Sequence, residues 1–113
     1  EMGWLGASIP EEYGGLGLGY LELCVIAEEL GRAVAPIPFG STVYLFAEAV
    51  LIAGTEEQKQ KYLPKVSAGE IIGALALSEG PGAVTPKTIK TTAAGGKLTG
   101  VKLPVADGDV ADF

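Results

Sequence analysis

Residues 54–82, GTEEQKQKYLPKVSAGEIIGALALSEGPG, contain the change of pattern that decides the fold of this chain. The stretch opens as a helix, because Thr55 and Gln58 form a capping box ahead of a charged, amphipathic run. Pro64 is expected to end that helix, since proline has no backbone N–H to donate. Residues 71–77 follow as a short apolar run, which is typical of a buried strand. The spacing of the apolar residues therefore changes within this stretch from that of a helix to that of a strand.

Two more helices are predicted upstream. Residues 20–30 place apolar side chains at helical spacing on one face, so Cys24 is expected to be a buried, unreactive thiol. Residues 42–53 form the second helix, with Ser41 as its N-cap and Glu48 as its only charge. A helix of this length spans about 18 Å. A bilayer core is about 30 Å thick, so we expect a buried helix rather than a membrane segment.

Strands are predicted downstream. Residues 88–93 and 98–105 have strand composition, and Gly95-Gly96 between them is a strong signal for a two-residue hairpin turn. Pro104 indicates an edge position or the end of the ladder. We therefore expect an α+β fold.

The domain organisation follows from the same change of period. A helical N-terminal domain is predicted for residues 1–67 and the start of an antiparallel β domain for residues 68–113. Both ends read as cut: the chain begins at Glu1 without an initiator methionine, and its last residues resemble the opening of another strand.

Composition narrows the class of function. Eight Lys and Arg residues against 14 Asp and Glu residues give a net charge of −6, which disfavours nucleic-acid binding. A single cysteine excludes a disulfide framework and fits a reducing cytoplasm. The absence of histidine disfavours metal catalysis and Ser-His or Cys-His nucleophilic catalysis, so no metal site is predicted.

Two glycine-containing stretches invite a ligand-binding interpretation. Residues 15–19, GLGLG, do not follow a predicted strand, which argues against a dinucleotide fingerprint. Between Ser78 and Thr85, a Gly-Pro-Gly loop follows the apolar run at 71–77. Hydroxyls and exposed N–H groups in such a loop can cradle a phosphate or a polar ring edge. An ordinary connection between strands is the alternative, and the chemistry of the residues leaves both open.

Three further stretches, in this order and spacing, resemble the acyl-CoA dehydrogenase family. They are residues 3–17 (GWLGASIPEEYGGLG), 27–32 (AEELGR) and 54–64 (GTEEQKQKYLP). The resemblance covers nearly the whole chain. It implies a helical N-terminal domain, a middle β-barrel domain and a C-terminal four-helix domain. The chain would hold most of the first and about the first three strands of the second.

The resemblance also implies an activity. Family members use FAD to form the α,β double bond of an acyl-CoA thioester in fatty acid metabolism, and pass the electrons to an electron-transfer flavoprotein. They are homo- or hetero-tetramers, cytoplasmic in bacteria. Their base is a glutamate of the C-terminal domain, so no catalytic residue is expected in this chain and the fragment alone should be inactive. The acyl chain is not indicated.

The family's flavin loop reads Thr-Glu-Pro-Gly-Ala-Gly-Ser-Asp, and residues 78–85 resemble it with an added Gly80 and with Val84 in place of glycine. The flavin contacts that the resemblance implies are Leu75, Leu77, Ser78 and Thr85. After Lys102 the family has an aromatic residue and then Thr or Ser, where this chain has Pro104 and Ala106. These departures favour an alternative, a non-catalytic subunit of a hetero-oligomeric acyl-CoA dehydrogenase. Another flavin enzyme on the same scaffold, such as an oxidase, is a third possibility.

Overall fold

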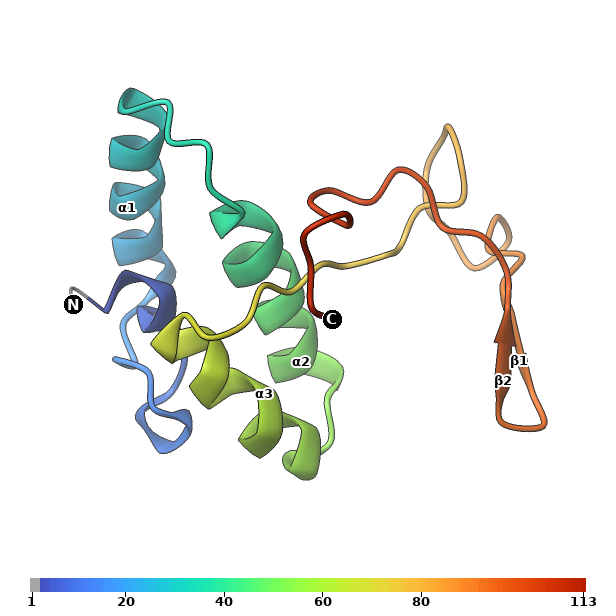
Figure 1. The fold of residues 1–113 in the computed structure, drawn as a ribbon, viewed down its shortest axis with the longest axis horizontal. Coiled ribbons are helices and arrows are strands. Elements are labelled where there is room, and N and C mark those ends of the chain that lie inside the picture. Colours follow the sequence, from blue (N-terminus) through green and yellow to red (C-terminus); the bar gives the residue numbers. More distant parts are fainter. Residues whose placement is uncertain (1–2) are drawn as a thin grey trace.

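The computed structural model describes residues 3–113, which form a helical body (residues 3–69) and an extended arm (residues 70–113) (Figure 1). The helices precede a two-stranded antiparallel sheet, which confirms the predicted α+β organisation. The elements in chain order are the 3-10 helices η1 (Trp4–Gly6) and η2 (Glu11–Tyr13), α1 (Tyr20–Arg32), the π-helix η3 (Gly40–Ala47), α2 (Glu48–Ala53), α3 (Glu56–Ala68), β1 (Thr92–Ala94) and β2 (Lys97–Thr99).

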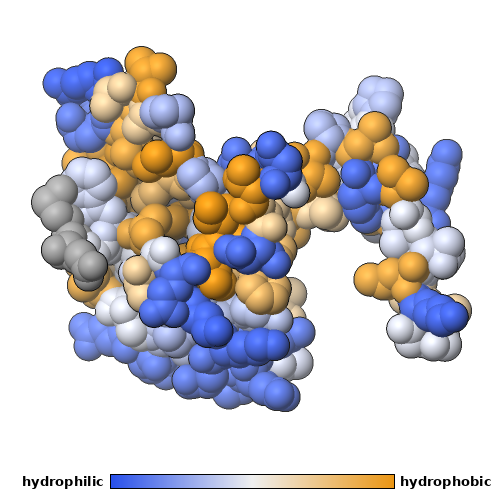
Figure 2. All heavy atoms as spheres, in the orientation of Figure 1, coloured by the Kyte–Doolittle hydropathy of each residue, from blue (hydrophilic) through white to orange (hydrophobic). Residues whose placement is uncertain are grey.

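The core lies entirely in the body and consists of two clusters of buried apolar residues. One joins η2, the end of η3 and α3, and contains Ile9, Tyr13, Ala47, Leu63 and Val66. The other joins α1 to the start of η3, and contains Ala7, Leu23, Phe39 and Val43. Figure 2 shows a hydrophilic band along the lower edge of the body, over α3, with apolar residues concentrated above it.

The α1 helix extends slightly beyond the predicted 20–30 and buries a narrower face than predicted. Leu23 is 3% exposed and packs against Phe39 and Val43, whereas Cys24 is exposed. The prediction of a buried thiol is therefore wrong. Successive residues of a helix lie about 100° apart, so the side chain next to a buried one turns away from the core when the packed stripe is narrow.

The second helix begins before its predicted N-cap. The backbone of Phe39 is already helical, so Ser41 lies inside η3 and is not the N-cap. Its hydroxyl donates to the carbonyl of Pro38 (3.1 Å) and to Asp107 of the arm (2.5 Å). The predicted end at Gly54 is confirmed, because Gly54 is extended.

This second helix is buried along one side only. Val43 and Ala47 are buried, whereas Leu45 is 42% and Ile52 is 81% exposed. The expectation that this helix is buried on most sides is thus confirmed for one face only within residues 3–113. None of the helices within residues 3–113 is both long and apolar enough to cross a membrane.

The α3 helix carries the predicted capping box and runs past its predicted end. The Thr55 N–H donates to the Gln58 side chain (2.8 Å), and the Gln58 N–H donates to the Thr55 hydroxyl (3.3 Å). The prediction that Pro64 ends the helix is wrong, because α3 continues to Ala68 and is terminated by Gly69, whose φ is 72°. Leu63 and Val66, on either side of the proline, are fully buried. Their packing offsets the penalty of an interior proline, about 3 kcal/mol.

The arm has less regular structure than the sequence predicts. The hairpin turn at Gly95-Gly96 is confirmed, with φ of 57° and 74° and Ala94 paired with Lys97. The strands β1 and β2 are shorter than the predicted 88–93 and 98–105. Residues 71–77 are extended and form no ladder within residues 3–113, so the predicted strand is absent there. Gly73 instead exchanges two hydrogen bonds with the Thr42 hydroxyl, at 3.2 and 3.3 Å.

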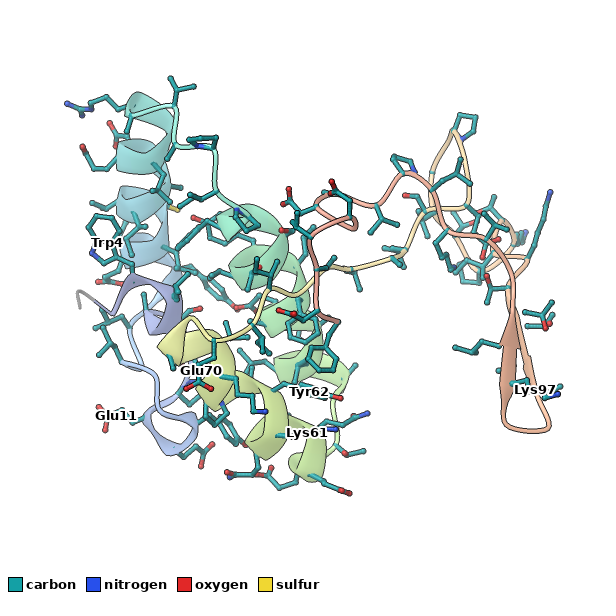
Figure 3. All side chains as sticks on the ribbon, in the orientation of Figure 1. Trp4, Glu11, Lys61, Tyr62, Glu70 and Lys97 are labelled. Carbon is teal, nitrogen blue, oxygen red and sulfur yellow. The ribbon has the colours of Figure 1, made fainter. Side chains whose placement is uncertain are left out.

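The C-terminal segment returns to the body (Figure 1). Asp112 donates its N–H to the carbonyl of Ile72, and the carbonyl of Phe113 accepts from the N–H of Ala74, each at 2.8 Å. The ring of Phe113 meets that of Tyr62 with centroids 5.0 Å apart, and Figure 3 shows Tyr62 on the side of α3 nearest this segment. The two ends of the arm are therefore anchored side by side on the body.

Candidate functional site

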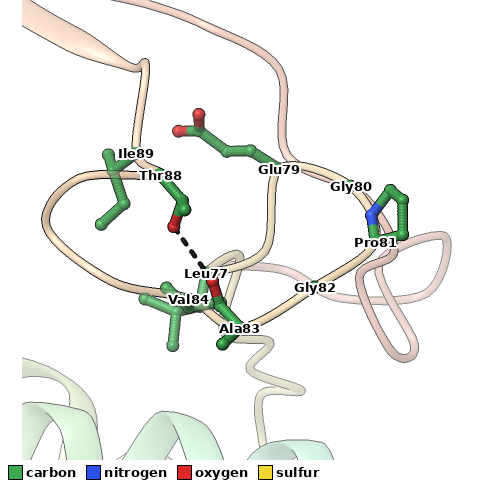
Figure 4. A pocket seen from close by; sticks show the side chains of 9 residues that line it. All are labelled: Leu77, Glu79, Gly80, Pro81, Gly82, Ala83, Val84, Thr88 and Ile89. Carbon is green, nitrogen blue, oxygen red and sulfur yellow. Dashed lines mark hydrogen bonds between the residues drawn. The ribbon is translucent and has the colours of Figure 1, made fainter.

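The loop predicted as a ligand site lies in the arm, between the segment that leaves the body and the β1–β2 hairpin (Figure 1), and encloses a small hollow (Figure 4). The hollow is about 50 Å³ and is lined by Leu77, Glu79, residues 80–84, Thr88 and Ile89. Gly80 and Gly82 have φ of 131° and 110°, a region that favours glycine. The added Gly80 therefore allows a tight turn ahead of Pro81. A hollow of this size has room only for water-sized groups. A larger ligand could therefore contact the loop on one side only.

The turn leaves three consecutive backbone donors free. The N–H groups of Gly82, Ala83 and Val84 make no hydrogen bond to any residue from 3 to 113. Successive unpaired N–H groups in a turn form a concave site for anionic or carbonyl oxygens. The donor chemistry at this position fits a phosphate or the polar edge of a ring.

Thr88 organises the second half of the loop, and its role was not expected from the sequence. Its hydroxyl donates to the carbonyl of Ala83 (3.0 Å; dashed in Figure 4) and accepts from the N–H of Thr85 (2.9 Å). The spacing of two threonines three residues apart, around Pro86, is typical of a side-chain-stabilised turn and was the available signal.

Glu79 closes the base of the loop. Its carboxylate accepts from the N–H groups of Lys90 (2.5 Å) and Thr91 (3.0 Å), from the Thr91 hydroxyl (2.5 Å) and from the Lys102 ammonium (2.7 Å). The hydrogen bonds from Lys102 and Thr91, followed by those from the backbone, lower the pKa of Glu79 to about 2. Lys102 also donates to the carbonyl of Leu77 at 3.2 Å.

The four predicted flavin contacts lie in different surroundings. Leu77 lines the hollow, and Ser78 is half-buried where the loop begins. Thr85 is exposed, with its hydroxyl 3.2 Å from that of Thr88. Leu75 lies nearer the body and lines a separate groove of about 360 Å³. Three of the four predicted contacts, Leu77, Ser78 and Thr85, thus lie at or in the loop, and of these only Leu77 lines the hollow.

The segment after Lys102 lies beside the start of the loop. Leu103 donates its N–H to the carbonyl of Ser78 (2.8 Å), and its own carbonyl accepts from the N–H of Gly80 (2.9 Å). Pro104 and Ala106 follow, and both are exposed. This edge of the site therefore presents neither an aromatic ring nor a hydroxyl from those two positions.

Elsewhere in the described chain, an apolar groove of about 450 Å³ lies between the end of α1 and residues 34–44. Its only side-chain hydroxyl, from Tyr44, is held by the carbonyl of Leu23 at 3.2 Å. Within residues 3–113, no cluster of three or more His, Cys, Asp and Glu side chains is placed to hold a metal ion.

Comparison with known proteins gives consistent matches. The family model for the acyl-CoA dehydrogenase N-terminal domain matches residues 1–70. The mitochondrial isovaleryl-CoA dehydrogenase of Solanum tuberosum is 52% identical over 77 residues, covering 66% of this chain and 19% of that protein. The chain therefore spans about a fifth of the length of this curated relative.

Two solved structures match nearly the whole chain. An acyl-CoA dehydrogenase complexed with FAD from Bacillus anthracis has a TM-score of 0.82 at 37% identity, covering 98% of this chain and 21% of that one. The structure described as an electron transferring flavoprotein of Acidaminococcus fermentans has a TM-score of 0.81 at 36% identity, covering 97% and 30%.

Proposed function

Since the chain belongs to the acyl-CoA dehydrogenase family, we propose that the full-length protein is an FAD-dependent enzyme that forms the α,β double bond of an acyl-CoA thioester. FAD, when bound, would supply the acceptor for the hydride that leaves the substrate. The likeness to an FAD-bound acyl-CoA dehydrogenase over 98% of the chain supports this proposal. A role in fatty acid metabolism and a cytoplasmic location are part of the same proposal.

The observation that carries the proposal is the loop with three free N–H groups at Gly82, Ala83 and Val84. We place the flavin against this loop, because such donors suit the carbonyl edge of the ring or the pyrophosphate. The proposed contacts are Leu75, Leu77, Ser78 and Thr85. The loop forms one wall only, and the rest of the cleft would come from the C-terminal part of the full-length protein.

We also propose a boundary between a helical domain, residues 1–67, and a β domain that starts at residue 68. The end of α3 at Ala68 and the end of the family match at residue 70 support it. The full-length protein would be a homo- or hetero-tetramer that binds acyl-CoA and passes electrons to an electron-transfer flavoprotein.

No residue of this chain is assigned as the catalytic base. A base must reach the proton that it abstracts and have a pKa near the working pH. Glu79 has a pKa of about 2, and both of its oxygens already accept hydrogen bonds. We therefore place the base outside the chain and propose that the fragment alone is inactive.

A specific observation favours the second candidate, a non-catalytic subunit of a hetero-oligomeric acyl-CoA dehydrogenase. Pro104 and Ala106 lie on the segment that pairs with the start of the loop, where the family has an aromatic residue and a hydroxyl. Without them the flavin loses a stacking ring and a hydrogen-bond donor. Such a subunit would shape a partner's site and hold no flavin.

The visible spectrum of the purified full-length protein separates these proposals. The enzyme should carry a flavin band near one flavin per chain that bleaches anaerobically when an acyl-CoA is added. A colourless protein that does not take up FAD supports the non-catalytic subunit. A bound flavin that no acyl-CoA reduces, but that another substrate reduces, supports a different flavin enzyme.

Activity of the fragment is tested separately, by mixing it with FAD, a panel of acyl-CoA thioesters and an artificial electron acceptor. We expect no turnover above background. Turnover above background would overturn the proposal that the fragment is inactive. Turnover that disappears in Glu79→Gln but persists in Lys102→Met, which loses the same ion pair, would show that the base lies in this chain.

A further inference from the structure

We propose that Glu79 is a positioning residue for the flavin loop: together with Lys102, its carboxylate holds residue 79 close to Lys90 and Thr91, on either side of the turn, and thereby fixes the arrangement of the N–H groups at residues 82–84. This inference rests on the proposed function, because it assigns a role within the flavin site. It adds a residue that contacts no ligand itself and acts through the loop.

The first support is that both oxygens of the Glu79 carboxylate accept hydrogen bonds. One carboxylate oxygen accepts from the Thr91 N–H, the Thr91 hydroxyl and Lys102, and the other accepts from the Lys90 N–H. The side chain of Glu79 is only 9% exposed. Hydrogen bonds to an ionised acceptor in such surroundings are stronger than neutral ones. The carboxylate therefore joins Glu79 to Lys90 and Thr91, which lie on either side of the segment that encloses the hollow.

The second support is that three segments of the chain meet at this point. Lys102 donates to Glu79 and to the carbonyl of Leu77, and Leu103 pairs with the backbone on both sides of Glu79. The carboxylate of Glu79 therefore lies where residues 78–80, residues 90–91 and the return segment at residues 102–103 meet. The loop between these ends contains two glycines with positive φ, Gly80 and Gly82, so its own backbone restricts it little.

The third support is the separation of this cluster from the core. Every hydrogen-bond partner of the Glu79 carboxylate within residues 3–113 lies between residues 90 and 102. The two core clusters, by contrast, consist of buried residues of the body alone. Loss of the carboxylate should therefore alter the loop and leave the helices folded. An exposed ion pair contributes little, but this pair is largely covered and includes two backbone donors.

The test measures FAD affinity in the full-length protein and in variants matched in size. Glu79→Gln keeps the shape and removes the charge, and Lys102→Met removes the partner. Each should weaken FAD binding about tenfold, the equivalent of one strong hydrogen-bonded charge. Lys102→Arg should restore most of the affinity. Lys97→Met is the control, since the Lys97 side chain makes no ion pair or hydrogen bond with another described residue.

Hydrogen exchange distinguishes positioning from a general loss of structure. In Glu79→Gln and Lys102→Met, peptides covering residues 80–91 should exchange faster, while those of α3 keep the wild-type rate. The exchange measurement needs no flavin. It therefore tests whether Glu79 orders the loop even if the wild-type protein does not bind FAD and the proposed function is wrong. Unchanged exchange in the loop, equal acceleration in α3, or wild-type FAD affinity in both variants would overturn the inference.

Discussion

The body and the arm are held in shape by different forces. All the buried apolar side chains among the described residues lie in the body, and Leu63 and Val66 of α3 are fully covered. The arm has none, and Leu98 and Val101 are 79% and 71% exposed. Its order depends on the Glu79 cluster and on the return of its last residues to the body. The helical region is therefore governed by packing, whereas the region that would touch a cofactor is governed by charge.

The largest effect should come from the core of the body. Leu63→Ala removes a fully buried side chain and should lower the free energy of unfolding by about 3 kcal/mol, the usual cost of such a cavity. Leu98→Ala makes the same change at a position 79% exposed in the hairpin, and should cost less than about 0.5 kcal/mol. Urea unfolding followed by helical circular dichroism measures both. Equal losses in the two variants would remove the distinction between the regions.

The junction between the regions should show the next largest effect. A Cβ atom at Gly73 would overlap the ring of Phe46, so Gly73→Ala should destabilise by about 1–3 kcal/mol through overpacking. At Gly31 in α1 a Cβ atom would meet no atom within 4 Å beyond its chain neighbours and the backbone of its own helix, so Gly31→Ala should be neutral or stabilise by about 0.5–1 kcal/mol. The same unfolding assay applies. Unchanged stability of Gly73→Ala would show that the start of the arm, at Gly73, does not pack against Phe46 of η3.

Acid should affect the arm before the body. The pKa of Glu79 is about 2 in the folded chain, below its ordinary value of 4.5, because Lys102 and Thr91 bind the carboxylate. Its stabilisation is therefore complete above about pH 4.5 and is lost as the pH falls toward 2. Protection of residues 80–91, corrected for the intrinsic pH dependence of amide exchange, should fall across this range in the wild type and stay constant in Glu79→Gln. If protection of residues 80–91 depended on pH in the same way in both proteins, Glu79 would not be the group that orders the loop.

Alkali should act on the body instead. Burial and the hydrogen bonds from its hydroxyl to Glu56 raise the pKa of Tyr13 from 10.0 to about 12. The neutral phenol stabilises the fold below pH 10, and this stabilisation is lost as the pH rises through 12. Tyr13→Phe should flatten the dependence of helix stability over that range. The hairpin should respond equally in both proteins.

The sequence predicted correctly those features that depend on residues close together in the chain, such as helix caps and tight turns. The capping box of Thr55 and Gln58 and the turn at Gly95-Gly96 are both present. The predicted stop at Pro64 failed because distant packing on Leu63 and Val66 outweighs a local penalty. Sequence position alone does not reveal such long-range contacts.

The candidate site shows the same limit. The loop after Ser78 was recognisable from its glycines, its proline and its hydroxyls. The pairing of Glu79 with Lys102 joins residues far apart in the sequence, and no local pattern predicts it. The strand predicted at 71–77 is absent: Ile71 packs against the core of the body, and residues 72 and 74 make only single backbone hydrogen bonds to residues 112 and 113, which do not form a ladder.

The central claim is that the loop of the arm, and not the apolar groove of the body, receives the flavin. Hydrogen exchange of the full-length protein with and without added FAD tests this claim most directly. We predict slower exchange at Gly82, Ala83 and Val84 when FAD binds, with no change in α1 and α3. Protection that appears in the groove at residues 34–44 while the loop stays unprotected would contradict it.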